Sequence, residues 1–291
     1  MSSPAATEFM GPASEMAREA GALLLEFARK GVETEYKGEA DLVTAADRAS
    51  EKLIVGRLRK EFPKHDIFGE EGTRDVTGSD YRWHIDPLDG TTNFAHGYPA
   101  YCVSMGLERH VSGTGADWEG ELVAGVIYDP TRDELYAAEK GSGAFLNGKR
   151  MHVSKTPRVK DSLLATGFPS QKRHKNPNIY FYHQLSLRSH GVRRAGSAAL
   201  DLACVASGKF DGFWEFNLNA WDTAAGVILV REAGGKVSQF RGEPFHISSK
   251  EVMASNGLLH EALLEEFATI FSGAGLEEIS DPRQYAETRQ F

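Results

Sequence analysis

The feature that most constrains the fold of this 291-residue chain is a change in its hydrophobic period. Apolar residues recur with helical spacing in two early blocks, at residues 12–30 and 44–62. From about residue 81 onward, short apolar runs of strand length alternate with turn residues such as Asp129-Pro130. The order of these segments predicts helices packed in layers against sheets.

The predicted strands of the first half cover residues 81–85, 103–109, 122–128 and 134–138. In the second half, we expect strands at 163–166, 211–216 and 252–255 and helices at 180–189, 197–207, 221–233 and 258–271. Thr44 and Asp47 have the spacing of a capping box at the start of the second helix. The predicted fold class is α/β, a layered α+β sandwich, and the polar tail from residue 272 is expected to be loosely held.

Bulk properties exclude some classes of partner. A formal net charge of -8 argues against binding nucleic acid or an anionic membrane through bulk charge. It is compatible with a phosphorylated substrate, because bound cations can invert the local field. The first eight residues do not resemble a signal peptide, and no run approaches the ~18 apolar residues of a membrane span. We therefore expect a cytoplasmic protein whose apolar-flanked Cys102 and Cys204 stay reduced.

The segment at residues 83–94, Trp-His-Ile-Asp-Pro-Leu-Asp-Gly-Thr-Thr-Asn-Phe, carries most of the chemical information. A predicted strand ends directly before Asp86, and Asp89 follows three residues later. Gly90 permits a close backbone approach, and a helix start at Thr91 offers free N–H groups that bind phosphate oxygens. The loop thus combines hard oxygen ligands for a cation with donors for a phosphate. The alternative is a turn in which the two acids only cap a helix.

Two further acidic segments accompany this loop. Glu70 and Glu71 follow an apolar run directly, and Asp222 opens a predicted apolar helix. Taken separately, the first pair is compatible with a solvated loop, and Asp222 with an ordinary N-terminal helix charge.

Together the three segments resemble the inositol monophosphatase family. Its hallmarks are Glu-Glu, Asp-Pro-(Ile/Leu)-Asp-Gly-Thr-Thr-Asn-Phe and Trp-Asp-x-Ala-Ala-Gly, and they occur here in that order, starting at Glu70, Asp86 and Trp221. The resemblance extends from about residue 8 to residue 270. It implies an αβαβα sandwich of the sugar-phosphatase type, with an N-terminal half of about 8–150 that carries the metal loop, a C-terminal half of about 151–270, and a tail at 271–291.

The resemblance also implies roles for individual residues. Two or three Mg²⁺ ions per site would be bound by Glu70, Asp86, the main-chain carbonyl of Leu88, Asp89 and Asp222, all oxygen ligands of the kind Mg²⁺ prefers. The substrate would contact Asp89, Gly90, Thr91, Gly196, Ser197, Ala198, Glu215 and Asp222. Glu70 and Thr91 would orient the attacking water, and Asp86 would bridge two metals. Asp47 and Lys37 would support the ligands from behind.

Electrostatics favours one shared site for these acids. Two carboxylates ~4 Å apart repel by roughly 4 kcal/mol at an effective dielectric constant near 20, so four of them would converge only around cations. Four carboxylates and a phosphate dianion carry about six negative charges, which three divalent ions balance.

The function implied is the hydrolysis of a small polyol or sugar phosphate monoester, with myo-inositol monophosphate as the first substrate, by metal-activated water. Inhibition by lithium and a homodimer are further expectations from the family. The Thr-Thr-Asn-Phe ending, and Glu215 seven residues before Asp222, favour the inositol type over the nucleotide type. A fructose-1,6-bisphosphatase or a broad-specificity sugar phosphatase is the alternative enzyme. A regulatory or binding protein without turnover is the alternative from another class.

Overall fold

The computed structural model describes residues 8–30, 34–36, 42–113, 119–168, 176–278 and 283. The helices in this part of the chain are α1 (Met10–Lys30), α2 (Ala45–Glu61), α3 (Thr91–Ala95), α4 (Asn178–Arg188), α5 (Ala198–Ala206), α6 (Ala220–Glu232), α7 (His260–Ser272) and a short 3₁₀ helix at Val159–Asp161.

Two large sheets and one small one are built from the described strands. β1 (Thr34–Tyr36) pairs with β2 (Leu42–Thr44). The strands of the eight-stranded sheet, in spatial order, are β10 (Lys149–Met151), β9 (Gly143–Leu146), β8 (Glu134–Glu139), β7 (Glu119–Asp129), β6 (Cys102–Ser112), β5 (Tyr81–Asp89), β3 (Asp66–Gly69) and β4 (Arg74–Asp75). The strands of the five-stranded sheet are β12 (Gly191–Arg193), β11 (Leu163–Thr166), β13 (Gly212–Phe216), β15 (Glu251–Ser255) and β14 (Lys236–Ser238).

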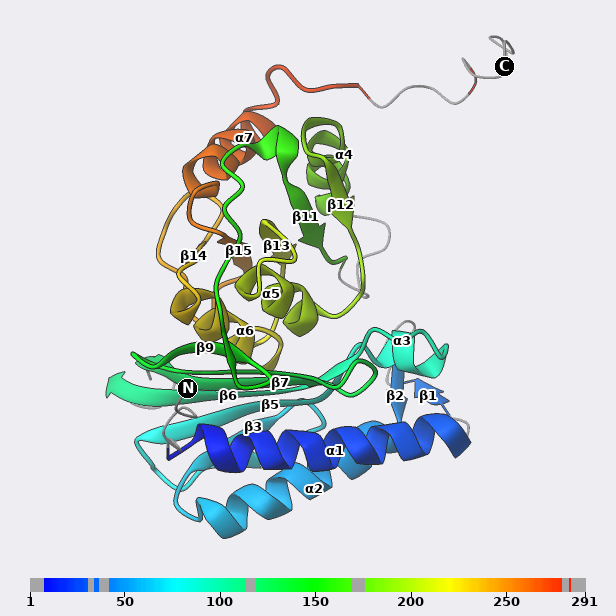
Figure 1. Cartoon of the computed structure of the whole chain (residues 1–291), viewed down its shortest axis with the longest axis vertical. Helices are drawn as coiled ribbons and strands as arrows, with labels where there is room; N and C mark the ends of the chain where they lie inside the picture. The colour runs from blue at the N-terminus through cyan, green and yellow to red at the C-terminus, as the bar shows by residue number, and fades with distance from the viewer. Residues whose placement is uncertain are drawn as a thin grey trace.

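The elements stack in five layers, as Figure 1 shows. Helices α1 and α2 cover the outer face of the eight-stranded sheet, and α5 and α6 lie between the two large sheets. Helices α4 and α7 cover the outer face of the five-stranded sheet, where their apolar residues form one cluster with β11, β13 and β15. The predicted αβαβα sandwich is confirmed. No helix in the described residues is long and apolar enough to cross a lipid bilayer.

Most predicted helices and strands are present, with shifts at their ends. Helix α1 begins at Met10, two residues before the predicted start. Thr44 caps α2 as expected: its side chain accepts from the N–H groups of Ala46 and Asp47, and the Asp47 carboxylate accepts from the Thr44 N–H at 2.7 Å. The prediction missed short strands of two to four residues, such as β3, β4, β9 and β10, because so short a segment shows no hydrophobic period.

The start of the tail is held more firmly than expected. Gln184 of α4 donates to the Glu277 carbonyl at 2.7 Å, and the Glu277 N–H donates back to the Gln184 side chain at 3.0 Å. The expectation of a loose tail is therefore wrong at this point. Residues 279–282 and 284–291 lie outside the described residues.

Helix α6 is apolar on all sides and lies between the two large sheets, where residues 223–230 are all buried. Glycines allow its close approach to the eight-stranded sheet. A Cβ atom built at Gly106 of β6 would lie 2.3 Å from the Ala224 Cβ, and one at Gly125 of β7 would lie 2.5 Å from Ile228. These contacts fix where α6 begins, and with it the position of Asp222.

We predict that Gly106→Ala destabilises the protein by roughly 1–3 kcal/mol, because the added methyl group must displace α6. The matched control is Gly56→Ala on the exposed face of α2, where nothing lies within 4 Å of the added Cβ. This second substitution should stabilise the protein by about 0.5–1 kcal/mol through helix propensity. Urea unfolding of both variants checks the pair, and equal effects would contradict the packing argument.

Candidate functional site

A β-bulge in β5 brings two of the predicted acids to one face of the sheet. Asp86 pairs with Ser104 of β6 and Asp89 pairs with Cys102, so three steps along β5 match two along β6. Residues three apart in a regular strand point to opposite faces, and the extra residue of a bulge returns Asp89 to the face of Asp86. Pro87 suits the bulge because it has no N–H to donate to the ladder.

Thr91 connects this bulge to α2. Its hydroxyl lies 3.0 Å from Asp47 Oδ1 and 3.1 Å from the carbonyl oxygen of Leu88. Asp47 is buried and also closes the capping box with Thr44, so one carboxylate joins the start of α2 to the loop. Gly90 opens α3 with φ 100°, and a Cβ there would lie 2.7 Å from a neighbouring carbonyl oxygen, so only glycine fits.

Glu70 reaches the site from the neighbouring strand. β3 runs parallel to β5 with Gly69 beside Ile85, and the Glu70 N–H donates to the Ile85 carbonyl at 3.1 Å. The next residue of β5 is Asp86, so the two acids lie side by side. Glu51 of α2 is buried behind this loop and accepts a hydrogen bond from the Glu71 N–H at 2.8 Å. The carboxylate of Glu51 thereby fixes the conformation of the Glu70 loop.

Asp222 lies in the first turn of α6 and has two structural partners. Its Oδ2 accepts from the Asn219 N–H at 2.6 Å and closes a capping box with that residue. The ordinary role of an N-terminal helix charge is therefore present. Ser104 of β6 donates to the carbonyl of Trp221 at 3.3 Å, which ties the start of α6 to the strand beside Asp86. Asp222 thus adjoins the bulge as predicted.

Asp89 is tied to the N-terminus of α5. Its Oδ2 accepts from the Ser197 hydroxyl and from the Ala199 N–H, both at 2.7 Å. The thiol of Cys102 lies 4.0 Å from the same oxygen. The structure therefore brings the Gly196–Ala198 segment against the bulge, as the resemblance implied.

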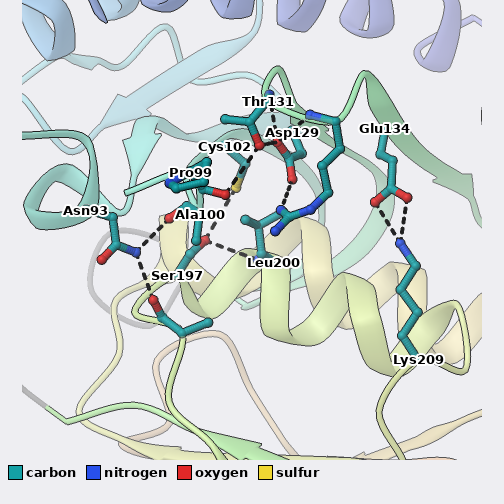
Figure 2. A network of polar contacts seen from close by, with 12 residues as sticks. Asn93, Pro99, Ala100, Cys102, Asp129, Thr131, Glu134, Ser197, Leu200 and Lys209 are labelled. Atoms are coloured by element: carbon teal, nitrogen blue, oxygen red, sulfur yellow. Dashed lines mark hydrogen bonds and ion pairs between the residues drawn. The ribbon is translucent and has the colours of Figure 1, made fainter. Parts of the chain in front are cut away.

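Asn93 of α3 fixes the position of this segment, as Figure 2 shows. Its amide group donates to the carbonyl of Ala100 at 2.7 Å and to that of Ala195 at 2.8 Å. Gly196 follows with φ 85°, and a Cβ there would lie 3.2 Å from the Asn93 amide. One side chain from the metal-loop motif thus positions the glycine of the predicted substrate pocket.

Glu215 of β13 lies buried at the side of this segment. Its carboxyl group occupies space that Gly167 leaves free, since a Cβ at Gly167 would lie 2.1 Å from it. Burial raises the pKa of Glu215 well above its ordinary value, and the charges of Asp201, Asp222 and Asp89 raise it further. Glu215 is therefore close to the predicted acids although it belongs to the other large sheet.

The four predicted ligands repel one another. Burial raises the pKa of Asp86 well above its ordinary value, and a further rise comes from the charges of Glu70, Asp89 and Asp222. The smallest contribution to the raised pKa of Asp86 is a side-chain hydrogen bond with Glu70, which favours the protonated form of Asp86. Burial likewise raises the pKa of Asp89 to about 6 and that of Asp222 to about 7.

The side chains of the four predicted ligands do not have the geometry of a preformed metal site. Within the described residues, no group of three or more His, Cys, Asp or Glu has the geometry to hold a metal ion. Asp86, Asp89 and Asp222 each have one carboxylate oxygen that already accepts a hydrogen bond from a backbone N–H group. For Asp86 the donor is the Leu88 N–H, at 3.0 Å from Oδ1. The donor set itself, four mutually repelling carboxyl groups with hard oxygens, fits a divalent cation such as Mg²⁺.

The sequence alone did not indicate the supporting roles of Glu51 and Asn93. A third supporting residue that it did predict, Lys37, cannot be checked. Glu51 lies three residues before the inward-facing Ile54 and seven before Leu58, so its place on the apolar stripe of α2 was a signal that it is buried. Asn93 was noted only as part of a motif. Lys37 lies outside the described residues.

Comparisons with known proteins agree with this arrangement. Residues 6–272 match the inositol monophosphatase family. An inositol-1-monophosphatase of Mesorhizobium japonicum is 43% identical over 81% of this chain and 86% of its own length. The Nus factor SuhB of Pseudomonas aeruginosa is 42% identical over 85% of this chain and 91% of its own. The solved inositol monophosphatase of Anabaena (Nostoc) sp. superposes with a TM-score of 0.78 at 42% identity, covering 90% of this chain and 95% of that one.

The fold and the site define a hydrolase of phosphate monoesters. The chain belongs to the inositol monophosphatase family. The family resemblance and the phosphatase activity expected from the sequence are thereby confirmed.

We predict that the metal-free protein loses stability between about pH 4 and pH 7. Unfolded Asp89 and Asp222 release their protons near 3.8, but in the folded protein the pKa values rise to about 6 and about 7. The folded state therefore binds more protons in this window, and its stability falls as pH rises. In EDTA, the Tm of Asp222→Asn minus that of the wild type should grow across the window. A difference that stays constant with pH would contradict the prediction.

Proposed function

We propose that this protein is a magnesium-dependent phosphatase that hydrolyses a small polyol phosphate, with myo-inositol monophosphate as its preferred class of substrate. The observation that carries the proposal is the cluster of Glu70, Asp86, Asp89 and Asp222 beside the Gly196–Ala198 segment, in which the charges of the other three acids raise the pKa of Asp86. Activity on inositol 1-phosphate that requires Mg²⁺ and disappears in EDTA is the direct test. No release of phosphate from any ester at saturating Mg²⁺ would refute the proposal.

The metal ligands we propose are those of the sequence analysis. Glu70, Asp86 and the Leu88 carbonyl would hold one Mg²⁺, and Asp86, Asp89 and Asp222 a second. When bound, these ions would neutralise the phosphate and activate water. The charges of Glu70, Asp89 and Asp222 all raise the pKa of Asp86, so this carboxyl group is close to each of the other three, which supports its role as the bridging ligand. Because the pKa of Asp86 is raised, a proton held by this carboxyl group would leave as a cation binds.

The protein groups around the ligands have separate tasks in this proposal. Glu70 and Thr91 orient the attacking water, and Asp47 fixes the Thr91 hydroxyl through its 3.0 Å contact. The backbone at Gly90 and Thr91 binds phosphate oxygens. Ser197 and the Ala199 N–H keep Asp89 in place, each at 2.7 Å.

We assign the polyol pocket to Gly196, Ser197, Ala198 and Glu215. A buried carboxyl group that recognises hydroxyls discriminates strongly against esters that lack them, because an unmatched polar group would be left unpaired. Asp89 and Asp222 contribute to the same wall, since their charges raise the pKa of Glu215. Fructose 1,6-bisphosphate is the alternative substrate.

The family also suggests an oligomeric state, a location and an inhibitor for this protein. We propose a homodimer in the cytoplasm, two to three Mg²⁺ per site, and inhibition by lithium at the position formed by Asp86, Asp89 and Asp222. A second candidate function is a regulatory one, because a relative 42% identical to this chain is named a Nus factor. We propose neither a nucleic acid nor a membrane as a binding partner.

We predict that Glu70→Gln lowers kcat by about 10²–10⁴-fold and raises the Mg²⁺ requirement, because a neutral amide is a poor base and a poor ligand. Glu119→Gln, at the exposed start of β7, is the control of equal charge change and should leave both quantities within about threefold. Recovery of the full kcat at high Mg²⁺ would remove Glu70 from the water-orienting role.

We predict that Glu215→Gln reduces the preference for inositol 1-phosphate over glycerol 2-phosphate by roughly tenfold, with little change in the Mg²⁺ requirement. The ratio of kcat/KM values for the two esters measures this directly, and it is independent of the amount of active protein. An unchanged ratio would exclude Glu215 from the pocket.

A further inference from the structure

A second concave surface lies at the far end of α6 from Asp222. It is a cavity of about 610 Å³ between the end of α6, β14 and the start of α7. Its polar lining residues are Arg231, Lys236, Ser238, Arg241, His260 and Glu261. Arg231 lies nine positions after Asp222 on the same helix, which corresponds to roughly 14 Å along the axis. The cavity is therefore distinct from the carboxylate site.

The guanidinium of Arg231 has few hydrogen-bond partners in this cavity. Arg231 is exposed, but the protein around its guanidinium partly desolvates it and lowers its pKa, while the charge of Glu121 acts in the opposite direction. The only hydrogen bond that its side chain makes among the described residues runs to the Phe245 carbonyl and is long, at 3.4 Å. A guanidinium has five N–H donors in a planar fork, so most of its binding capacity is left for a ligand.

Two more cations line the same cavity. Arg241 lies 4.5 Å above the ring of Phe271. Lys236 is 3.3 Å from Glu261, in an exposed pair that contributes little. Three cations and one carboxylate leave a local charge of +2 in the cavity, against -8 for the whole chain. A positive patch of this kind on an acidic protein attracts small anions.

The floor of the cavity is ordered and neutral. The Ser238 hydroxyl donates to the Gln239 carbonyl at 2.7 Å and lies 3.0 Å from His260 Nε2, which must then be the donor. His260 Nδ1 lies 2.9 Å from the Ser255 hydroxyl and accepts from it. Burial lowers the pKa of His260, and the charge of Lys236 lowers it further. The uncharged ring therefore supports the wall without adding to the charge.

We propose that this cavity binds a small phosphorylated metabolite, through its phosphoryl group, at Arg231 and Arg241. A guanidinium group matches the geometry of phosphate oxygens, and the net charge of +2 among the lining residues balances a phosphate dianion. The cavity is larger than inorganic phosphate needs and lies within the range of about 300–1,000 Å³ typical of small-molecule sites. The site adds a second ligand to the protein and does not depend on which ester it hydrolyses.

The test is calorimetric titration of the full-length protein in EDTA with fructose 1,6-bisphosphate and, separately, with inorganic phosphate. Without divalent cations the carboxylate cluster repels both anions, so the heat reports the cavity. We expect the bisphosphate to bind with a Kd of about 1 mM or lower. Arg231→Gln/Arg241→Gln should weaken binding at least tenfold. Equal affinity for phosphate would mean that a phosphoryl group alone is recognised.

The matched control is Arg59→Gln/Arg158→Gln, which removes two exposed arginines from other surfaces and should change the Kd less than twofold. Arg241→Gln alone keeps the test valid if the double variant is unstable. As a second readout, the bisphosphate should protect Arg231 from phenylglyoxal, measured by peptide mass spectrometry. Absence of binding, or equal weakening in the control, overturns the proposal. Neither result would affect the Mg²⁺-dependent hydrolysis proposed above.

Discussion

Repulsion between buried carboxyl groups is the constraint on which the rest of this structure depends. Glu70, Asp86, Asp89 and Asp222 come from three separate segments, and burial disfavours the charged forms of the three aspartates. A chain gains nothing in stability from such an arrangement by itself. The energy needed to assemble these acids must come from the packing of the elements that carry them, and bound cations would recover it.

The scaffold around the acids provides that packing. Glycines at 106 and 125 let α6 press against the eight-stranded sheet, which determines where Asp222 lies. Glu51 and Asp47 extend from one helix, α2, and hold the Glu70 loop and Thr91 respectively. Most of these supporting contacts are hydrogen bonds from buried side chains. Loss of any one would leave a buried polar group unsatisfied and loosen the site.

The sequence predicted the layers well, and it pointed to acids that the structure brings together, because both depend on local patterns. The strand end, the two acids and the helix start occur within residues 83–94, and the capping box of α2 within four residues. The bulge between Asp86 and Asp89 could not be predicted, since it exists only relative to β6. The same holds for the contact of Asn93 with Ala195, which joins residues 102 positions apart. The short strands β3, β4, β9 and β10 were missed because segments of two to four residues show no hydrophobic period.

Binding of Mg²⁺ to these acids should displace protons, and calorimetry of Mg²⁺ binding measures this most directly. Titrations at pH 6.5 in buffers of different ionisation enthalpy give the number of protons released per site. Because the pKa values of Asp89 and Asp222 rise to about 6 and about 7, and that of Asp86 lies well above its ordinary value, we predict the release of at least one proton per site. In Asp222→Asn the number should fall. Binding of Mg²⁺ without any proton release would contradict the account.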